Sequence, residues 1–139
     1  MSYLLDTCLL SELTRPRPDP GIVAWVGATP DHARFVSVIS LAEIRFGILC
    51  APAGQKRKKL EAWFEQELEP SLAGRTLAFD QPVALRWAAL RAAYRNAAVL
   101  DSQIAATALE HDLTLVTRNI RDFRFQGLKT LNPWDRTQG

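Results

Sequence analysis

The stretch DSQIAATALEHDLTLVT, residues 101–117, decides the fold class because it places a helix directly before a strand. The small and apolar residues from Ile104 to Ala108 predict a helix over about 101–111. After a turn at Asp112, the apolar run 113–117 predicts a strand. A helix that feeds straight into a strand is typical of folds with a mostly parallel sheet.

The rest of the chain shows the same alternation. We expect further strands at 2–6, 34–39, 75–79 and 128–131. We expect further helices at 7–15, 21–28, 41–51, 56–69 and 81–95, with a helical turn near 120–123. Prolines mark the breaks: three within residues 16–20, Pro52 after one helix and Pro70 at the end of another. The sequence therefore predicts an α/β fold with a mostly parallel sheet between helices.

The length and composition fit one domain over residues 1–139, with 47% hydrophobic and 23% charged residues. No apolar run approaches the roughly 20 residues of a membrane span, and the N-terminus does not resemble a secretory signal. Cys8 and Cys50 show no disulfide or metal spacing, so we expect a reducing, cytoplasmic location. The net charge of +2 is low for a dedicated nucleic-acid binder but does not exclude an enzyme that holds nucleic acid transiently.

Four carboxylates stand where predicted strands end or predicted helices begin: Asp6, Glu43, Asp101 and Asp122. The carboxyl ends of parallel strands gather at one edge of the sheet, where ligands bind. Four acids brought together there repel one another, and a divalent cation relieves that repulsion. His32 and His111 stand alone, which argues against zinc.

Each acid also has a purely structural explanation. Asp6 and Asp101 suit helix N-caps, and Ser40 with Glu43 reads as a capping box. Asp122 suits a turn. Capping alone does not explain why all four should converge at one edge of the sheet, so the metal-site hypothesis stands beside it.

Four segments occur in a familiar order: LDT at 5–7, SLAEI at 40–44, LDSQIAATA at 100–108 and LVTRNIRDF at 115–123. Together with LSEL at 10–13, the following RPRP and LNPW at 131–134, they resemble PIN-domain ribonucleases of the VapC toxin type, in the branch that includes FitB-like proteins. The resemblance covers essentially the whole chain. It implies a three-layer α/β/α PIN-like fold, Mg²⁺- or Mn²⁺-dependent cleavage of RNA, and neutralisation by a cognate antitoxin protein.

The resemblance assigns catalytic, metal-holding positions to Asp6, Glu43, Asp101 and Asp122, and supporting polar positions to Thr7, Thr117 and Asn119. The chain departs from the family pattern in two places. Cys8 stands where Asn is frequent, which we expect to remove a hydrogen bond behind the acids. The segment 95–100 before Asp101 is short, so it delivers that residue to the site with little slack.

Several basic and aromatic residues have two interpretations. The run 55–59 is more simply a solvated face than a phosphate contact. Arg118 and Arg121 lie next to the expected site and suit either an RNA phosphate or an ion pair with an acid. The tryptophans on apolar helical faces suit core packing first, and contacts with a second copy or an antitoxin second: Trp25, Trp63 and Trp87.

These observations predict a metal-dependent endoribonuclease, the toxin of a type II toxin–antitoxin pair. The expected partners are RNA, a cognate antitoxin and a second copy of the chain in a homodimer, with DNA reached only through the antitoxin and no membrane. The alternative is an antitoxin-binding partner in a DNA-binding autoregulatory complex, with weak or vestigial nuclease activity. A PIN-type nuclease acting on structured DNA is disfavoured by the small size of the chain. The choice between Mg²⁺ and Mn²⁺ stays open.

Overall fold

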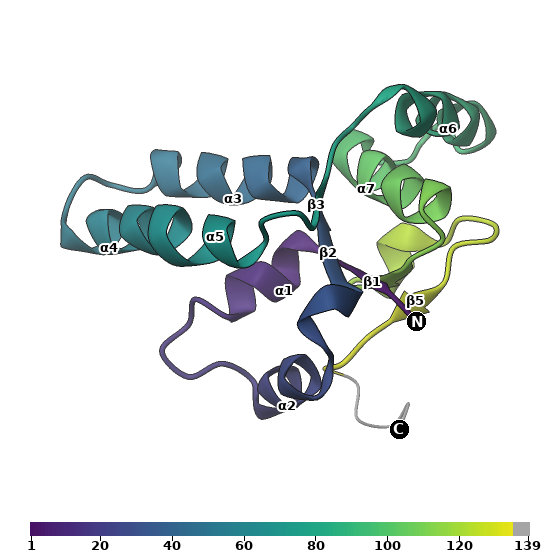
Figure 1. Ribbon diagram of the computed structural model, residues 1–139. Helices are drawn as coiled ribbons and strands as arrows, with labels where there is room; N and C mark the ends of the chain where they lie inside the picture. The colour runs from purple at the N-terminus through teal and green to yellow at the C-terminus, as the bar shows by residue number, and fades with distance from the viewer. Residues whose placement is uncertain (135–139) are drawn as a thin grey trace.

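The computed structural model describes residues 1–134 and contains a five-stranded, fully parallel sheet (Figure 1). The strand order is β3-β2-β1-β4-β5. The strands are β1 (Tyr3–Leu5), β2 (Arg34–Ser37), β3 (Thr76–Leu77), β4 (Thr114–Val116) and β5 (Thr130–Leu131). The predicted α/β class and parallel sheet are confirmed, although each strand is shorter than predicted.

The helices alternate with the strands as expected. They are α1 (Thr7–Glu12), α2 (Pro20–Ala28), α3 (Val38–Cys50), α4 (Gln55–Trp63), α5 (Glu69–Ser71), α6 (Gln81–Ala93) and α7 (Val99–Glu110). Short 3₁₀ turns are η1 (Asp31–Ala33) and η3 (Ile120–Phe123), and the π-helical η2 (Phe64–Leu68) joins α4 to α5. Within residues 1–134, no helix is both long and apolar enough to span a membrane.

Successive strand residues feed two separate cores on the two faces of the sheet. Leu5 and Val116 pack in a core with residues of α1, α2, α3 and η2. Their neighbours Leu4 and Leu115 pack in a second core with residues of α6, α7 and η3. This follows from the period of two in a strand, where neighbouring side chains point to opposite faces. Figure 1 shows α6 and α7 together on one side, while α3, α4 and α5 form an elongated arm on the other.

The strand order places a switch point between β1 and β4. From β1 the chain moves outward through β2 to β3, and then crosses back to β4 on the other side of β1. Helices leave the carboxyl ends of two neighbouring strands in opposite directions at such a point, which opens a crevice there. Asp6 follows β1 and Thr117 follows β4, so both lie at this crevice.

Two helices, α3 and α7, begin two or three residues earlier than the sequence predicts. Ser37 caps α3 by accepting a hydrogen bond from the amide of Ile39, so the capping box of Ser40 and Glu43 was a wrong prediction. Helix α7 begins at Val99 after Ala98, so Asp101 lies within its first turn and is not its N-cap. The cap side chain nearest the strand end determines the start of α3, and this shifts Glu43 into its second turn.

The arm also extends past its predicted end. Pro70 does not terminate the helix, because helical structure continues to Ser71. The π-helical register of η2 precedes Pro70. A proline lacks a backbone N–H and disturbs the ordinary i to i−4 ladder, and a local change of register before it accommodates this defect.

Replacement of Leu115 by Ala tests the second core. Leu115 is fully buried, so the substitution leaves a cavity and we expect a loss of about 2–5 kcal/mol in the free energy of unfolding. Urea unfolding followed by circular dichroism measures it. Leu85, 64% exposed on α6, provides the matched control, and Leu85→Ala should change stability by less than about 0.5 kcal/mol. Equal losses in both variants would contradict the assignment of the core.

Candidate functional site

Asp6 is buried at the junction of β1 and α1, with only 6% of its surface exposed. Its backbone N–H donates to the carbonyl of Val116 at 3.0 Å, which ties it to β4. Its carboxylate accepts hydrogen bonds from the Thr7 amide and the Thr117 hydroxyl, both at 2.8 Å. Asp6 is therefore a helix N-cap, which confirms the structural explanation, and it also lies at the crevice between β1 and β4, where the metal-site hypothesis places it.

Glu43 reaches the same region from α3. Thr7 Oγ1 donates a hydrogen bond to Glu43 Oε1 at 2.8 Å, which links the start of α1 to the second turn of α3. Thr7 thus connects the two acids, because its amide binds Asp6 and its hydroxyl binds Glu43. Residues 36 positions apart in the chain are held together by this contact.

Asp101 and Asp122 approach from the opposite side. Asp101 is half-buried in the first turn of α7, and Asp122 is exposed in η3. Both line a cleft of about 600 Å³ that also contains Arg121 and Arg124. The elements after the crossover therefore bring two of the predicted acids to one cleft.

The electrostatics connect all four acids. Burial, followed in order of size by the negative charges of Asp6, Asp122 and Glu43, raises the pKa of Asp101 from its ordinary value of 3.8 to about 6. Among the ion pairs formed within residues 1–134, none involves any of these four carboxylates. The structure thus brings the acids within electrostatic reach and gives them no basic partner among the described residues.

The acids do not form a closed ligand set. Within residues 1–134, no three acidic, histidine or cysteine side chains are grouped tightly enough to hold a metal ion by themselves. An uncompensated set of oxygen donors still suits a hard divalent cation, and Mg²⁺ in particular retains several water ligands. The donor chemistry therefore fits a cation bound partly through water.

The two remaining supporting residues lie at the end of β4. Thr117 is fully buried, accepts a hydrogen bond from the Asn119 amide at 3.0 Å and donates to Asp6. Asn119 contributes through its backbone, while its side chain is exposed. Thr117 thus fixes the orientation of the Asp6 carboxylate, and Asn119 fixes Thr117.

Cys8 contacts Asp6, although we expected that a cysteine at this position would remove a hydrogen bond behind the acids. Its thiol lies 3.5 Å from Asp6 Oδ2, and its sulfur accepts from the Arg118 amide at 3.5 Å. Burial raises the pKa of the Cys8 thiol, and the charge of Asp6 raises it further, so the thiol stays protonated near neutral pH. A protonated thiol is a weak hydrogen-bond donor, so Cys8 partly replaces the hydrogen bond to the acids that we expected to be absent.

The cleft also has walls that the sequence analysis missed. Tyr94 falls at the end of the helix predicted over 81–95, and Arg95 begins the short segment before Asp101, yet both line the cleft beside Asp101. Arg124 lines it from the other side. The shortness of the segment before Asp101 was the one available signal, because a tight connection forces its residues close to the acid that follows.

Comparison with known proteins gives the family. The model of the PIN domain family matches residues 3–126 of the chain. This chain belongs to the PIN-domain family. Similar proteins include the VapC ribonuclease Y4jK of Sinorhizobium fredii, 37% identical over 95% of this chain and 97% of that protein. Toxin FitB of Neisseria gonorrhoeae is 38% identical over 94% of this chain and 97% of that protein.

Solved structures of other PIN domains show the same fold. The structure of FitAB bound to an IR36 DNA fragment matches with a TM-score of 0.89 and 36% identity, covering 96% of both chains. FitAcB from Neisseria gonorrhoeae matches with a TM-score of 0.89 and 38% identity, covering 95% of this chain and 98% of that one. The resemblance drawn from the sequence motifs is confirmed, and so is the PIN-like α/β fold.

The raised pKa of Asp101 predicts how the stability of this PIN domain depends on pH. Because its pKa is higher in the folded chain than its ordinary value of 3.8, the folded state binds more protons between 3.8 and about 6. The contribution of this group to the free energy of unfolding therefore falls as the pH rises through that window. Urea unfolding in EDTA at several pH values measures the free energy of unfolding of the wild type and of Asp101→Asn. The wild-type value minus the variant value should fall as the pH rises through that window. Curves that run parallel across the window would contradict it.

Proposed function

We propose that this PIN domain is a metal-dependent endoribonuclease and the toxin of a toxin–antitoxin pair. The observation that carries the proposal is the gathering of Asp6, Glu43, Asp101 and Asp122 at the switch-point edge of the sheet without a basic partner in residues 1–134. A VapC ribonuclease and toxin FitB, at 37% and 38% identity over nearly the full length, support it.

Asp6, Glu43 and Asp101 would hold one divalent cation, Mg²⁺ or Mn²⁺, directly or through water, and Asp122 would complete the site. A divalent cation, when bound, lowers the pKa of water and neutralises charge on a phosphate group. The protein orients the acids: Thr117 holds Asp6 and Thr7 holds Glu43, both through hydrogen bonds of 2.8 Å. Groups behind a metal ligand typically change metal affinity or activity 10–100-fold when removed.

The partner in this proposal is an antitoxin protein. The matching solved structures are described as a complex of FitAB with DNA and as FitAcB, and the proposal extends that kind of assembly to this chain. DNA would then be contacted through the antitoxin. The second candidate, an antitoxin partner with vestigial activity, draws on the same DNA complex.

The first test is cleavage of total cellular RNA by purified wild type and Asp6→Asn in Mg²⁺, Mn²⁺ or EDTA. We expect discrete fragments from the wild type with either metal, and none in EDTA. Asp6→Asn keeps the shape of the side chain but removes its charge, so activity should fall by more than the 10–100-fold typical of losing an outer partner. The cleavage activity of Thr117→Val should decrease by about 10–100-fold relative to the wild type.

The matched control is Glu67→Gln, which neutralises an exposed acid of η2 away from the site. It should cleave like the wild type. Activity that survives in Asp6→Asn would contradict the assigned site. Absence of cleavage by folded, partner-free wild type with both metals would favour the second candidate.

Metal binding provides a readout independent of cleavage. In the wild type, Mn²⁺ at 100 times its Kd should stabilise the folded state by about 2.7 kcal/mol. This stabilisation should be lost in Asp6→Asn and retained in Glu67→Gln. Thermal unfolding with and without Mn²⁺, together with calorimetric titration, measures both effects. Equal Mn²⁺ affinity in Asp6→Asn and wild type would show that Asp6 does not hold the ion.

A further inference from the structure

Two clefts lie on either side of η3 and share a wall. The first, of about 600 Å³, contains Asp101 and the segment from Tyr94 to Ala98. The second, of about 560 Å³, contains Arg118 and Asn132. Arg121, Asp122 and Arg124 line both clefts, so they form a ridge between them, here called the η3 ridge. The ridge therefore carries the site acid Asp122 with one arginine on each side of it in the chain, Arg121 and Arg124.

The arginines of the two clefts differ from most others in the chain. Of the twelve arginines in residues 1–134, seven use their guanidinium in an ion pair or hydrogen bond: Arg15, Arg34, Arg45, Arg57, Arg75, Arg86 and Arg91. No such contact within these residues is made by the other five: Arg17, Arg95, Arg118, Arg121 and Arg124. Four of those five line the two clefts.

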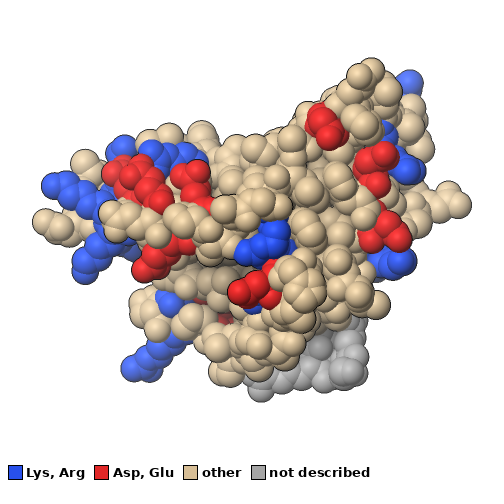
Figure 2. Space-filling model, viewed as in Figure 1, with Lys and Arg blue, Asp and Glu red and all other residues tan. Residues whose placement is uncertain are grey.

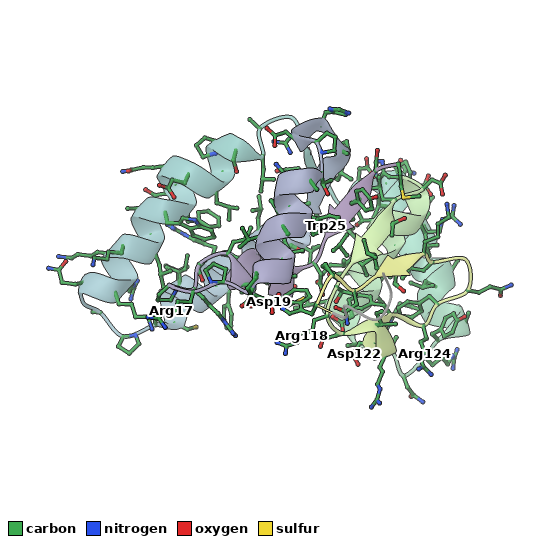
Figure 3. The ribbon with its side chains drawn as sticks, turned by 90° about the horizontal axis from the view of Figure 1, so that it is seen from below. Arg17, Asp19, Trp25, Arg118, Asp122 and Arg124 are labelled. Atoms are coloured by element: carbon green, nitrogen blue, oxygen red, sulfur yellow. The ribbon has the colours of Figure 1, made fainter. Side chains whose placement is uncertain are left out.

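The position of these arginines is also distinctive. Figure 3 shows Arg118, Asp122 and Arg124 together at one edge of the molecule, with Arg17 set apart from them. On the face in Figure 2, in contrast, acidic and basic side chains lie side by side over the arm formed by α3, α4 and α5. There, Arg57 pairs with Glu61 and Arg45 with Glu65. The guanidinium groups near the site are therefore left available to an anion from outside the described chain.

The ridge stands on a rigid base. Phe123 and Phe125 are buried in the second core, at 2% and 7% exposure. The Tyr94 ring packs edge-on against Phe125 with centroids 5.0 Å apart, and the Tyr94 hydroxyl accepts a hydrogen bond from the Gln126 amide at 2.9 Å. Arg118 is placed over the Trp134 ring, 5.8 Å from its centroid. The backbone that carries the arginines is thus ordered before any ligand arrives, which lowers the entropic cost of binding.

We propose that the η3 ridge binds the phosphates of single-stranded RNA on both sides of the acid cluster, with Arg121 and Arg124 as the principal contacts. Arg95 would extend the track in the first cleft and Arg118 in the second. This inference rests on the proposed nuclease function, since it places the flanking phosphates of that substrate. Clefts of about 600 Å³ have the size of small-ligand pockets, so they suit an extended strand rather than a duplex.

The test is binding of a short fluorescent single-stranded RNA in EDTA, by anisotropy at several salt concentrations. Arg121→Ala/Arg124→Ala should weaken binding about tenfold per arginine removed. It should also reduce the slope of log affinity against log salt by about 0.7 per lost phosphate contact, or about 1.4 in all. In Mn²⁺, the same variant should raise KM for cleavage more than it lowers kcat, because it removes ground-state contacts remote from the reacting phosphate.

Two controls separate this surface from other basic residues. Arg17→Ala removes the one arginine of residues 1–134 that lies outside the clefts and makes no ion pair or hydrogen bond there, and Lys58→Ala/Lys59→Ala removes the same total charge as the ridge variant from α4. Both should bind RNA with the affinity and salt slope of the wild type. Equal loss in the lysine variant would overturn the proposal, because it would reveal a general charge effect.

Other outcomes are equally decisive. Wild-type affinity and slope in the ridge variant would overturn the proposal, even if metal-dependent cleavage is intact and the nuclease function stands. Loss of binding in the ridge variant would support it, even if the wild type cleaves no RNA and the nuclease function fails. A duplex bound as tightly as the single strand would overturn the single-strand assignment. If the alanine variant has a lowered Tm, Arg121→Gln/Arg124→Gln provides the same test with less change in side-chain bulk.

Discussion

The rest of this structure depends on the pairing of β1 with β4 through Asp6. The Asp6 amide extends the ladder to the Val116 carbonyl, and its carboxylate accepts the Thr117 hydroxyl. One residue therefore ends a strand, caps α1 and joins two strands from opposite ends of the chain. Because Asp6 is only 6% exposed, the orientation of its carboxylate is determined by these partners and not by solvent. The neighbouring acids are positioned around it by α3, α7 and η3.

In the part of the chain that the structure describes, the edge of the sheet concentrates charge of both signs without ion pairs between them. Burial and, after it, the neighbouring acids raise the pKa of Asp101 to about 6, which is an energetic cost of the arrangement. The unpaired arginines of the η3 ridge lie beside them and share clefts with Asp101 and Asp122. Elsewhere, arginines are used in ion pairs on the arm and between α6 and α7. Such segregation is what a site for a cation and a polyanion requires, because internal pairing would compete with both ligands.

Much of the fold was predictable because its periodicities are local. The alternation of helices and strands identified the parallel sheet, and the motif order identified the PIN-domain family. The errors arose where two local signals competed. Ser40 and Glu43 match a capping box, yet Ser37 lies nearer the strand end and caps α3 instead. Pro70 predicts a helix end, yet the π-helical η2 lets helical structure continue to Ser71. A sequence window alone does not rank such competing signals.

The sequence by itself determined which acids are present, their order between strands and helices, and the family to which the chain belongs. These follow from side-chain chemistry and from spacing along the chain. Only the tertiary structure decided that Thr7 joins Asp6 to Glu43, that Cys8 retains a weak contact with Asp6, and which arginines remain unpaired. The physical reason is that hydrogen bonds and ion pairs act over a few ångströms between residues up to 111 positions apart in the chain. Their partners are set by how the strands cross over, which no local pattern encodes.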